Sequence, residues 1–370
     1  MRVLITGADG FVGKNLQLRL RERKDVEVVT YTRADKLADL PKALDGVNVL
    51  FHLAGVNRPK DPQEFVGNAE LTQFLSDTVR NSGRPMRLIL TSSTQAPLNN
   101  LYGVSKRQAE QALQSLVGVN GTIVHLFRLP NVFGKWCKPN YNSAVATFCH
   151  NISRDLPVQI NDPNAIVTLV YIDDVLDRFI DLMDGADAVI DSEGFEAITP
   201  QYTITVGELV RQITAFRECR DSLVIDRVGA GLVRALYATY VSYLPVERFA
   251  YEVPLYGDSR GMFVEMLKTP DCGQFSFFTA HPGVTRGGHY HHTKTEKFLI
   301  IKGRARFRFR HMQTGQTHEL ETTGANPQIV ETVPGWTHDI TNIGSDEMVV
   351  MLWANEVFDR AKPDTYTCPV

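Results

Sequence analysis

Residues 2–13, RVLITGADGFVG, decide the fold of the first half of the chain. An apolar run is followed at once by a turn with three glycines, where a helical pattern begins. Glycines at such a junction let the backbone approach a pyrophosphate, and the N-terminus of the helix favours the anion. The spacing is GxxGxxG rather than GxGxxG, and glycines also occupy such turns for packing alone, but the strand–turn–helix context favours a dinucleotide site. The expected cofactor-binding residues of this turn are Gly7, Gly10, Phe11, Val12 and Gly13.

The pattern of the chain changes in its last third. Before that point, apolar runs such as RLILTSS (87–93) alternate with helical patterns such as VGELVRQITAFREC (206–219). Strands that alternate with long helices indicate a doubly wound parallel sheet, a Rossmann-like α/β fold. After it, short segments with a period of two, such as RARFRFRH (304–311), follow one another between turn residues. Many short strands indicate a sandwich or barrel, so we predict an α/β domain over 1–244 and an all-β domain over 245–370.

Composition and charge argue against several classes of protein. A chain of 370 residues with 43% hydrophobic and 22% charged residues suits two globular domains. The net charge of −3 gives no electrostatic support for a nucleic-acid partner. No run approaches the ~18 apolar residues of a membrane span, and the first residues resemble a strand rather than a signal peptide. The 5 cysteines are scattered without a CxxC pair, which suits reduced thiols, so we expect a cytoplasmic protein.

The end of the second predicted strand, VVTYTRAD (28–35), bears on the choice of cofactor. An enzyme that uses NAD usually has Asp or Glu at this tip, where the carboxylate binds the ribose 2′-hydroxyl. Here Thr32 and Arg33 stand at the tip, and a guanidinium pairs well with a 2′-phosphate. The sequence therefore favours NADPH over NADH. The alternative is that Arg33 is only a solvated loop cation.

A further motif, LTSSTQAPLNNLYGVSK (90–106), ends a strand with two serines and begins a helix with YxxxK. Tyr102 and Lys106 are four residues apart, so both lie on one face of the helix. The ammonium is expected to lower the pKa of the tyrosine from about 10, which makes the phenol a usable proton donor or acceptor. A serine hydroxyl, from Ser93 or Ser92, can bind the same carbonyl oxygen. YxxxK alone is common, but its conjunction with the serines and the glycine turn is specific.

The order of these motifs resembles that of the extended short-chain dehydrogenase/reductases that act on nucleotide sugars. The likeness covers roughly residues 1–240 and includes HLAGVNRP, YGVSK, RLPNVFG and VYIDDV. It implies that Ser93, Tyr102 and Lys106 form the catalytic set, with Ser92 as the alternative if the register shifts by one. The further cofactor-binding residues that it implies are Leu53, Ala54, Gly55, Tyr102 and Lys106. The residues that it implies near the sugar nucleotide are Arg128 and Asn131.

Histidines cluster in GVTRGGHYHHTKTEKFLIIKG (283–303). The spacing Gly-x5-His-x-His-x4-Glu-x6-Gly in this segment matches the first cupin motif. Downstream, PGWTHDITN (334–342) is close to the second motif, with one residue fewer between Pro and Gly. Residues i and i+2 of a strand face the same way, so the first two histidines can point into a barrel together. The predicted ligands of a divalent first-row metal are His289, His291, Glu296 and His338.

The ligand types restrict the metal without fixing it. Imidazoles leave Zn²⁺, Mn²⁺, Fe²⁺ and Ni²⁺ open, and Zn²⁺ is the first choice. The alternative is a barrel interior with hydrogen-bonded histidines and no metal. His292 faces the other way in the predicted strand and is expected at the surface or behind the ligands.

A second resemblance concerns the residues that flank the histidines. GDSRGMFVEMLKT (257–269) and VTRGGHYH (284–291) resemble segments of the nucleotide-sugar 3,5-epimerases, which are cupins that work on 4-keto-6-deoxyhexoses. In those enzymes the histidine at the position of His289 is linked to the catalytic base. His289 is therefore a candidate for two roles, metal ligand and base.

The whole chain, including RLPNVFGKWCKPNYNSAVATFCH (128–150), closely resembles the bifunctional capsular-polysaccharide enzymes of the CapF type. The resemblance implies that the cupin inverts C3 of a UDP-2-acetamido-2,6-dideoxy-4-ketohexose. The reductase would then use NADPH to reduce C4, giving UDP-2-acetamido-2,6-dideoxy-L-talose on the way to UDP-N-acetyl-L-fucosamine. The resemblance also implies a homodimer.

The chemistry of the sugar supports this order of steps. A 4-ketone acidifies the hydrogen on C3, and that acidity is lost once the ketone is reduced, so epimerisation has to come first. Two alternatives stay open. One is a plain NADPH-dependent 4-ketosugar reductase whose cupin only binds sugar and assists dimerisation. The other is a regulatory sugar-binding protein with a vestigial reductase.

Overall fold

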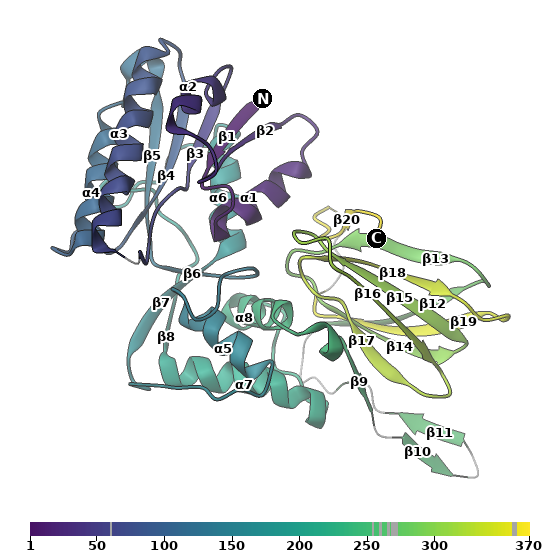
Figure 1. Cartoon of the computed structure of the whole chain (residues 1–370). Helices are drawn as coiled ribbons and strands as arrows, with labels where there is room; N and C mark the ends of the chain where they lie inside the picture. The colour runs from purple at the N-terminus through teal and green to yellow at the C-terminus, as the bar shows by residue number, and fades with distance from the viewer. Residues whose placement is uncertain (60, 254, 259–260, 265–266, 268–272, 357–360) are drawn as a thin grey trace. The chain divides into compact units, whose positions relative to one another are not determined.

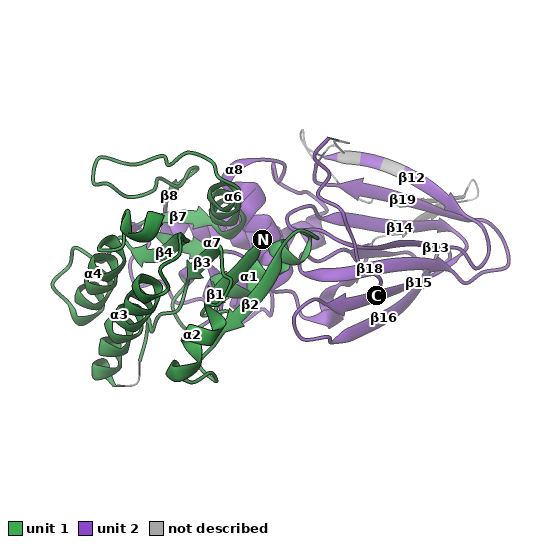
Figure 2. Ribbon diagram, turned by 90° about the horizontal axis from the view of Figure 1, so that it is seen from above, with its two compact units in different colours: residues 1–133, 140–143, 167–203 green, residues 134–139, 144–166, 204–370 purple. Residues whose placement is uncertain are grey.

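The chain forms two compact units, drawn in different colours in Figure 2. Unit 1 comprises residues 1–133, 140–143 and 167–203, and unit 2 comprises residues 134–139, 144–166 and 204–370. The boundaries of these compact units differ from the predicted domain boundary between residues 244 and 245. That boundary stays a prediction about where two separately folding domains meet. The computed structural model describes residues 1–59, 61–253, 255–258, 261–264, 267, 273–356 and 361–370.

Unit 1 is built on a parallel sheet with the strand order β2-β1-β3-β4-β5 (Figure 1). The strands are β1 (Arg2–Thr6), β2 (Glu27–Tyr31), β3 (Val49–His52), β4 (Arg87–Ser93) and β5 (Ile123–Leu129). The helices are α1 (Phe11–Arg21), α2 (Leu40–Ala43), α3 (Val66–Asn81), α4 (Leu101–Gln114) and α6 (Ile172–Met183). The strand order runs outward from β1 in both directions, so right-handed crossovers place helices on both faces of the sheet. The predicted doubly wound α/β fold is confirmed.

The central strands of unit 1 are buried along their length. Leu4, Leu50, Leu88 and Leu90 belong to one core cluster and are at most 2% exposed. Helices cover both faces of such a sheet, which explains why the apolar runs in the sequence do not alternate with polar residues. The carboxyl ends of parallel strands lie at one edge, so the turn after β1, the loop after β3 and the end of β4 come together there.

Shorter elements complete the first part of the chain. A three-stranded sheet has the order β6-β7-β8. Its strands are β6 (Asn131–Phe133), β7 (Ile166–Tyr171) and β8 (Tyr202–Thr205). The 3₁₀ helices among the described residues are η1 (Leu37–Asp39), η2 (Pro62–Phe65), η3 (Val119–Gly121) and η4 (Val246–Arg248).

The described part of unit 2 contains three α-helices and a β-sandwich. The helices are α5 (Ala144–Ile152), α7 (Val206–Ser222) and α8 (Gly231–Ser242). One five-stranded sheet has the order β12-β19-β14-β17-β9 and the other β16-β15-β18-β13-β20. The strands are β9 (Ala250–Glu252), β12 (Gln274–Ala280), β13 (Thr285–Tyr290), β14 (Glu296–Lys302), β15 (Arg304–His311), β16 (Thr317–Thr323), β17 (Gln328–Glu331), β18 (Trp336–Asn342), β19 (Met348–Ala354) and β20 (Tyr366–Thr367). A separate hairpin pairs β10 (Leu255–Asp258) with β11 (Gly261–Val264). The predicted cupin fold is confirmed.

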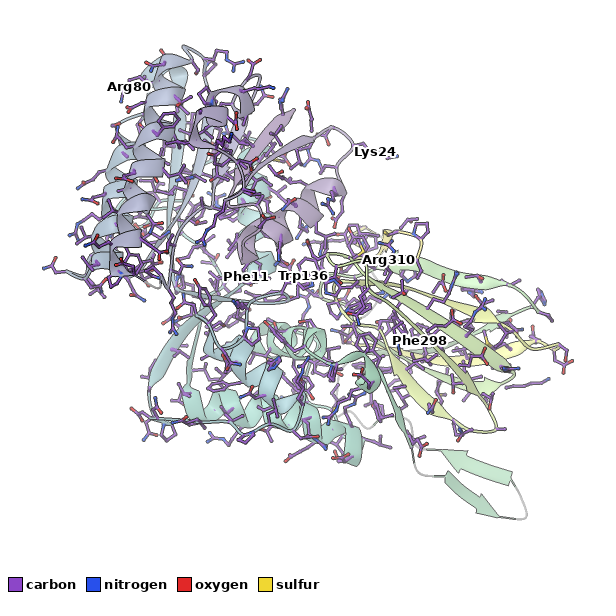
Figure 3. All side chains as sticks on the ribbon, viewed as in Figure 1. Phe11, Lys24, Arg80, Trp136, Phe298 and Arg310 are labelled. Atoms are coloured by element: carbon purple, nitrogen blue, oxygen red, sulfur yellow. The ribbon has the colours of Figure 1, made fainter. Side chains whose placement is uncertain are left out.

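Alternation along β14 gives its two faces different partners. Phe298 is buried between the sheets, where its ring lies 5.7 Å from that of Phe307 (Figure 3). Lys297 points to the other face, where it contacts Glu331, and Tyr237 of α8 donates a hydrogen bond to the same carboxylate. Glu296 shares the inner face with Phe298, because the two are two residues apart.

No helix among the described residues is long and apolar enough to cross a bilayer.

Candidate active site and candidate metal centre

The glycine turn in unit 1 is too tight for side chains. Gly7 has φ +69°, and a Cβ on it would lie 2.6 Å from the backbone nitrogen of Ala54. A Cβ on Gly13 would lie 2.4 Å from the carbonyl oxygen of Gly7. Gly10 is the N-cap of α1, which places Phe11 and Val12 in the first helical turn. The turn therefore fits a pyrophosphate at the helix N-terminus, beside the loop that contains Leu53 and Ala54.

The tip of β2 carries both a cation and a carboxylate. The backbone N–H and the hydroxyl of Thr32 donate to Asp35 Oδ2, at 2.7 and 2.9 Å. These bonds hold the pKa of Asp35 below its ordinary value. Arg33, between them, is exposed. Its side chain fits a 2′-phosphate by charge, and the preference for NADPH stays a prediction.

The end of β4 and the start of α4 bring three of the predicted residues together. The side chain of Asn100 caps α4 by accepting from Gly103 N at 2.8 Å. Tyr102 is hydrogen-bonded to Ser93, and Lys106 Nζ lies 5.9 Å from the centre of the tyrosine ring. The alternative serine, Ser92, faces away from Tyr102 and donates to the buried Glu110. The catalytic roles of Ser93, Tyr102 and Lys106 stay a prediction, and among the two serines the geometry favours Ser93.

Burial shifts the pKa values of both titrating side chains of this site. It raises the pKa of Tyr102, while the hydrogen bond to Ser93 acts in the opposite direction. The expectation that the pKa of this tyrosine is lowered is therefore wrong, because burial has the largest effect. Burial instead lowers the pKa of Lys106 to about 8, against the influence of Glu110. Tyr102 is consequently a phenol at neutral pH, which is the form that donates a proton.

The lysine also reaches the cofactor side of the site. Lys106 Nζ donates to Thr91 O at 3.2 Å. A Cβ on Gly55 would lie 3.1 Å from the same ammonium, a tight contact that would require the lysine side chain to shift. The predicted neighbours Gly55 and Lys106 are thus in contact distance.

A buried chain of hydrogen bonds that the sequence did not reveal supports this edge of the sheet. His52 contacts Thr6 Oγ1 at 2.7 Å and Thr72 Oγ1 at 2.8 Å. Thr72 donates to Asn68 O, and Asn68 Nδ2 donates to Ser105 at 3.2 Å. Burial lowers the pKa of His52 to about 3, so its imidazole is neutral. The chain connects β1, β3, α3 and α4 and fixes the helix that carries Tyr102.

The predicted sugar-nucleotide residues lie nearby with partners of their own. Arg128 Nε and Nη2 donate to Glu110 at 3.0 and 2.8 Å, and Nη1 donates to the exposed Glu193 at 2.8 Å. Asn131 is exposed, and its Nδ2 donates to Thr168 O at 3.1 Å. Glu110 was missed, although it continues the four-residue spacing of Tyr102 and Lys106. Contact of Arg128 and Asn131 with a substrate stays a prediction.

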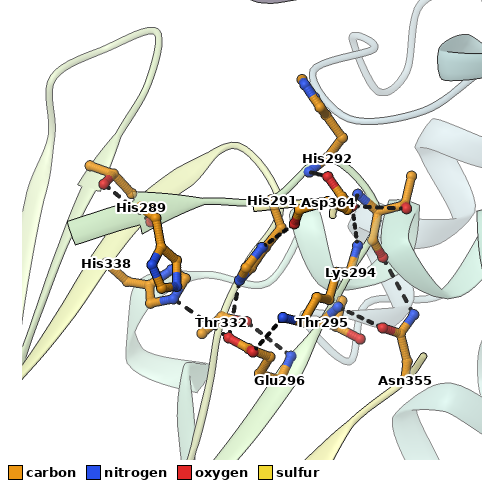
Figure 4. Close-up of polar contacts among 12 residues, drawn as sticks. His289, His291, His292, Lys294, Thr295, Glu296, Thr332, His338, Asn355 and Asp364 are labelled. Atoms are coloured by element: carbon orange, nitrogen blue, oxygen red, sulfur yellow. Dashed lines mark hydrogen bonds and ion pairs between the residues drawn. The ribbon is translucent and has the colours of Figure 1, made fainter. Parts of the chain in front are cut away.

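The predicted metal ligands lie together in unit 2 (Figure 4). One donor atom from each of His289, His291, Glu296 and His338 lies within 4.8 Å of all the others. His289 and His338 are cross-strand partners on β13 and β18, and Glu296 begins β14. His291 Nε2 lies 3.0 Å and His338 Nε2 lies 3.7 Å from Glu296 Oε2. The structure thus brings all four together as the motif spacing predicts.

The electrostatics of the cluster fit a divalent cation. Burial and the neighbouring imidazoles lower the pKa of His289 to about 3, and burial lowers that of His338 as well. The pKa of Glu296 lies well below its ordinary value, because His291, His338 and Lys294 together outweigh the opposing effect of burial. Both ring nitrogens of the buried His338 lack a hydrogen-bond partner among the described residues. A metal binds imidazoles in their neutral form and carboxylates in their ionised form. The cluster, with the unpaired ring nitrogens of His338, is therefore suited to a metal ion.

Two neighbours of the cluster were not predicted. Lys294 Nζ lies 2.9 Å from Glu296 Oε1. Asp364 contacts the loop after β13 from the C-terminal end of the chain, 73 residues from His291. No local pattern points to Asp364, because only the fold brings it there. His292 is buried, so its expected place at the surface is wrong, whereas a place behind the ligands agrees with its contact with Asp364.

The segment that carried the second resemblance is only partly described. Within GDSRGMFVEMLKT, residues 259–260, 265–266 and 268–269 lie outside the described residues. The second part, VTRGGHYH, contains all of β13 and the first two histidines of the cluster.

These two sites define a class of protein: a Rossmann-fold short-chain dehydrogenase/reductase joined to a cupin. Residues 3–195 match the NAD dependent epimerase/dehydratase family, and residues 256–366 match the polysaccharide biosynthesis C-terminal domain. The UDP-2-acetamido-2,6-beta-L-arabino-hexul-4-ose reductase of Pseudomonas aeruginosa is 60% identical over 100% of this chain and 99% of its own length.

Two solved structures match this chain over its full length. The capsular polysaccharide assembling protein CapF from Staphylococcus aureus is 38% identical, with a TM-score of 0.66 and 100% of both chains covered. CapF with the inhibitor 3-isopropenyl-tropolone is 36% identical, with a TM-score of 0.62 and the same coverage. This chain belongs to the NAD dependent epimerase/dehydratase family and is an enzyme of the CapF type.

Proposed function

We propose that this chain is a bifunctional nucleotide-sugar enzyme. The cupin inverts C3 of a UDP-2-acetamido-2,6-dideoxy-4-ketohexose, a UDP-4-keto-6-deoxy-N-acetylhexosamine. The reductase then uses NADPH to reduce C4 to UDP-2-acetamido-2,6-dideoxy-L-talose, in the pathway to UDP-N-acetyl-L-fucosamine for capsule or O-antigen. The observation that carries the proposal is the presence in one chain of a serine–tyrosine–lysine site and a buried histidine–glutamate cluster. The names of the relatives support the substrate class.

In the cupin, the 4-ketone makes the C3 proton removable because the resulting charge spreads onto the ketone oxygen as an enolate. A divalent metal, Zn²⁺ as the first choice, would be held by His289, His291, Glu296 and His338 and would supply a Lewis acid or hold the barrel together. His289 is the least buried of the four, and we keep both of its candidate roles, ligand and base. Reprotonation at C3 from the opposite face inverts the carbon.

In the reductase, NADPH supplies a hydride to C4 when it is bound. Tyr102, held as a phenol by burial, donates its proton to the ketone oxygen, which becomes the C4 hydroxyl. Ser93 donates a hydrogen bond to the same oxygen, and Lys106 stabilises the tyrosinate that remains. Arg128 and Asn131 bind the sugar nucleotide, with the phosphates replacing the exposed Glu193 on Arg128.

We further propose a cytoplasmic homodimer. The four described cysteines are free thiols, which suits a reducing compartment. For the partner, a second copy of this chain, the support is an apolar surface at the edge strand β12. There Phe277 is 72% exposed and Phe275 is 48% exposed, beside Met351 on β19. Exposed apolar side chains on an edge strand suit pairing between copies.

A second candidate is an NADPH-dependent 4-ketosugar reductase whose cupin binds sugar without chemistry. One observation favours it: the name of the 60% identical relative mentions a reductase alone. The two candidates differ in one measurable step, the exchange of the C3 proton with solvent.

The deciding experiment uses the purified full-length protein and the UDP-4-keto-6-deoxy-N-acetylhexosamine in D₂O. Without NADPH, the bifunctional enzyme incorporates deuterium at C3, and NMR detects it. With NADPH added, the product carries deuterium at C3 and a hydroxyl at C4. Reduction without exchange would support the second candidate, and no turnover of NADPH with any 4-keto sugar would contradict both.

A further inference from the structure

The C-terminal segment, residues 361–370, crosses the loop that connects two strands of the metal centre. Asp364 Oδ1 accepts from the backbone N–H of His292 at 2.9 Å (Figure 4). Its Oδ2 accepts from the backbone N–H groups of Thr293 and Lys294, both at 2.7 Å, and from the Thr293 hydroxyl at 3.1 Å. One carboxylate therefore binds the backbone N–H groups of residues 292–294, three of the four residues between the ligands His291 and Glu296.

The backbone carbonyl of Asp364 contacts one of the predicted metal ligands, His291, directly. His291 Nδ1 lies 2.5 Å from the carbonyl oxygen of Asp364. A carbonyl oxygen only accepts, so Nδ1 carries the proton of this bond. The other ring nitrogen, Nε2, lies 3.0 Å from Glu296 Oε2 and is the atom that would bind a metal. A ligand histidine held through its other nitrogen has its tautomer and ring orientation fixed before the metal arrives.

The segment continues as a strand beside the first ligand. Thr367 pairs with His289, and the backbone N–H of Cys368 donates to Gly288 O at 2.8 Å. Thr337, next to His338 on β18, donates its hydroxyl to the carbonyl oxygen of Cys368. The last ten residues thus contact a residue next to each of the three histidines of the cluster.

Aromatic packing holds the segment in this place. The ring of Tyr366 stacks on that of Tyr290 at 5.5 Å and lies 5.0 Å from the ring of His292. Arg310 on β15 donates to Pro369 O at 2.6 Å. Contacts on several strands mean that the segment is a component of the sandwich and not a loose end.

We propose that the C-terminal segment is a positioning element for the metal centre, and that Asp364 is its main positioning residue. It sets the turn between His291 and Glu296 and the tautomer of His291, so that the donor atoms are arranged before a metal binds. This inference rests on the metal centre of the proposed function. Removing Asp364 should therefore weaken metal binding without removing any ligand.

The test measures the affinity of the metal-stripped, full-length protein for Zn²⁺ alone, by competition with a fluorescent chelator. Asp364→Ala should bind Zn²⁺ about 10–100-fold more weakly than wild type. Asp364→Asn keeps one oxygen acceptor and should fall between the two. Asp346→Ala, which removes an exposed aspartate on the β18–β19 loop, should match wild type. The melting temperatures of the metal-free proteins report the fold separately, and Asp364→Asn serves if the alanine variant does not fold.

The outcomes separate this inference from the function on which it rests. Wild-type affinity in both Asp364 variants would overturn the inference and leave the metal centre intact. A wild-type protein that takes up no Zn²⁺ would overturn the metal centre and the inference with it. An Asp364→Asn variant with a lowered metal-free melting temperature but wild-type Zn²⁺ affinity would show that Asp364 serves stability alone, and would also overturn it.

Discussion

In the reductase site the buried ammonium of Lys106 lies on the same helix as Glu110. The carboxylate of Glu110 accepts two hydrogen bonds from Arg128. In the metal centre three imidazoles surround one carboxylate, Glu296, within 4.8 Å. The first site contains charges of both signs that balance each other. The second brings together imidazole nitrogens and a carboxylate oxygen, all of which can donate an electron pair to a metal cation.

Burial acts on both sites, but it has different consequences. In unit 1 it keeps Tyr102 as a phenol and brings the pKa of Lys106 down to about 8. In unit 2 it keeps His289 and His338 neutral, so that their lone pairs are free for a metal. The same low polarity therefore preserves a proton donor in one site and electron-pair donors in the other. Changes at one site should leave the other unaffected; the first two of four predictions test this separation, and the last two test the reductase site itself.

The largest effect is expected from Tyr102→Phe. Without its hydroxyl the reductase has no proton donor for the C4 oxygen, and NADPH oxidation should slow by about 10²–10⁴-fold. Zn²⁺ content and deuterium exchange at C3 should stay at wild-type values. Tyr202→Phe on β8 is the matched control. Loss of C3 exchange in Tyr102→Phe would show that the two sites are not separate.

Glu296→Gln makes the converse change. It keeps the size of the side chain but removes the carboxylate of the cluster, so Zn²⁺ affinity should fall by more than about 100-fold, beyond the effect of changes behind the ligands. Exchange at C3 should fall with it, while NADPH oxidation with an already epimerised 4-keto sugar persists. Glu319→Gln, on the exposed face of β16, should change neither. Full Zn²⁺ content with full exchange in Glu296→Gln would contradict the assignment.

The third prediction concerns pH. Lys106 is cationic below a pKa of about 8, so kcat/KM of the reductase should fall as pH rises through 8, by about tenfold per unit where only the cation is active. Lys106→Arg should move this fall to higher pH.

The stability of the fold should change with pH in the opposite direction. The folded pKa lies below the ordinary 10.5, so the unfolded chain binds more protons between the two values, and the free energy of unfolding rises with pH across that window.

Urea titrations between pH 8 and 10 check the stability half of this prediction, with Lys106→Met as the control that lacks the titrating group. A free energy of unfolding in wild type that falls across the window while that of the control does not would contradict the low pKa of Lys106.

The smallest effects separate the two serines. Ser93→Ala removes one hydrogen bond to Tyr102 and to the ketone oxygen, and turnover should drop by roughly three- to tenfold, about 0.5–1.5 kcal/mol. Ser92→Ala removes a bond to the buried Glu110, so it should lower the free energy of unfolding by about 1.5–3 kcal/mol. Its turnover should be close to wild type. The reverse pattern would show that Ser92 is the serine of the active site.

The sequence predicted the folds of both halves because their signals are local. The glycine turn after β1, the four-residue spacing of Tyr102 and Lys106, and the alternation along β15 follow from the periods of helices and strands. The histidine and glutamate spacing was sufficient for the metal cluster, since one motif supplies three of its four residues within eight positions. The spacing of residues within a short segment can be read from the sequence, wherever that segment lies in the fold.

Only the tertiary structure showed that Ser93 and not Ser92 contacts Tyr102, that Glu110 holds Arg128, and that Asp364 reaches the metal centre. It also reversed the expected shift of the tyrosine pKa. These facts depend on which distant segments pack together and on how much water they exclude. Periodicity within a segment carries no information on either, because burial and long-range contacts arise only when the strands and helices assemble.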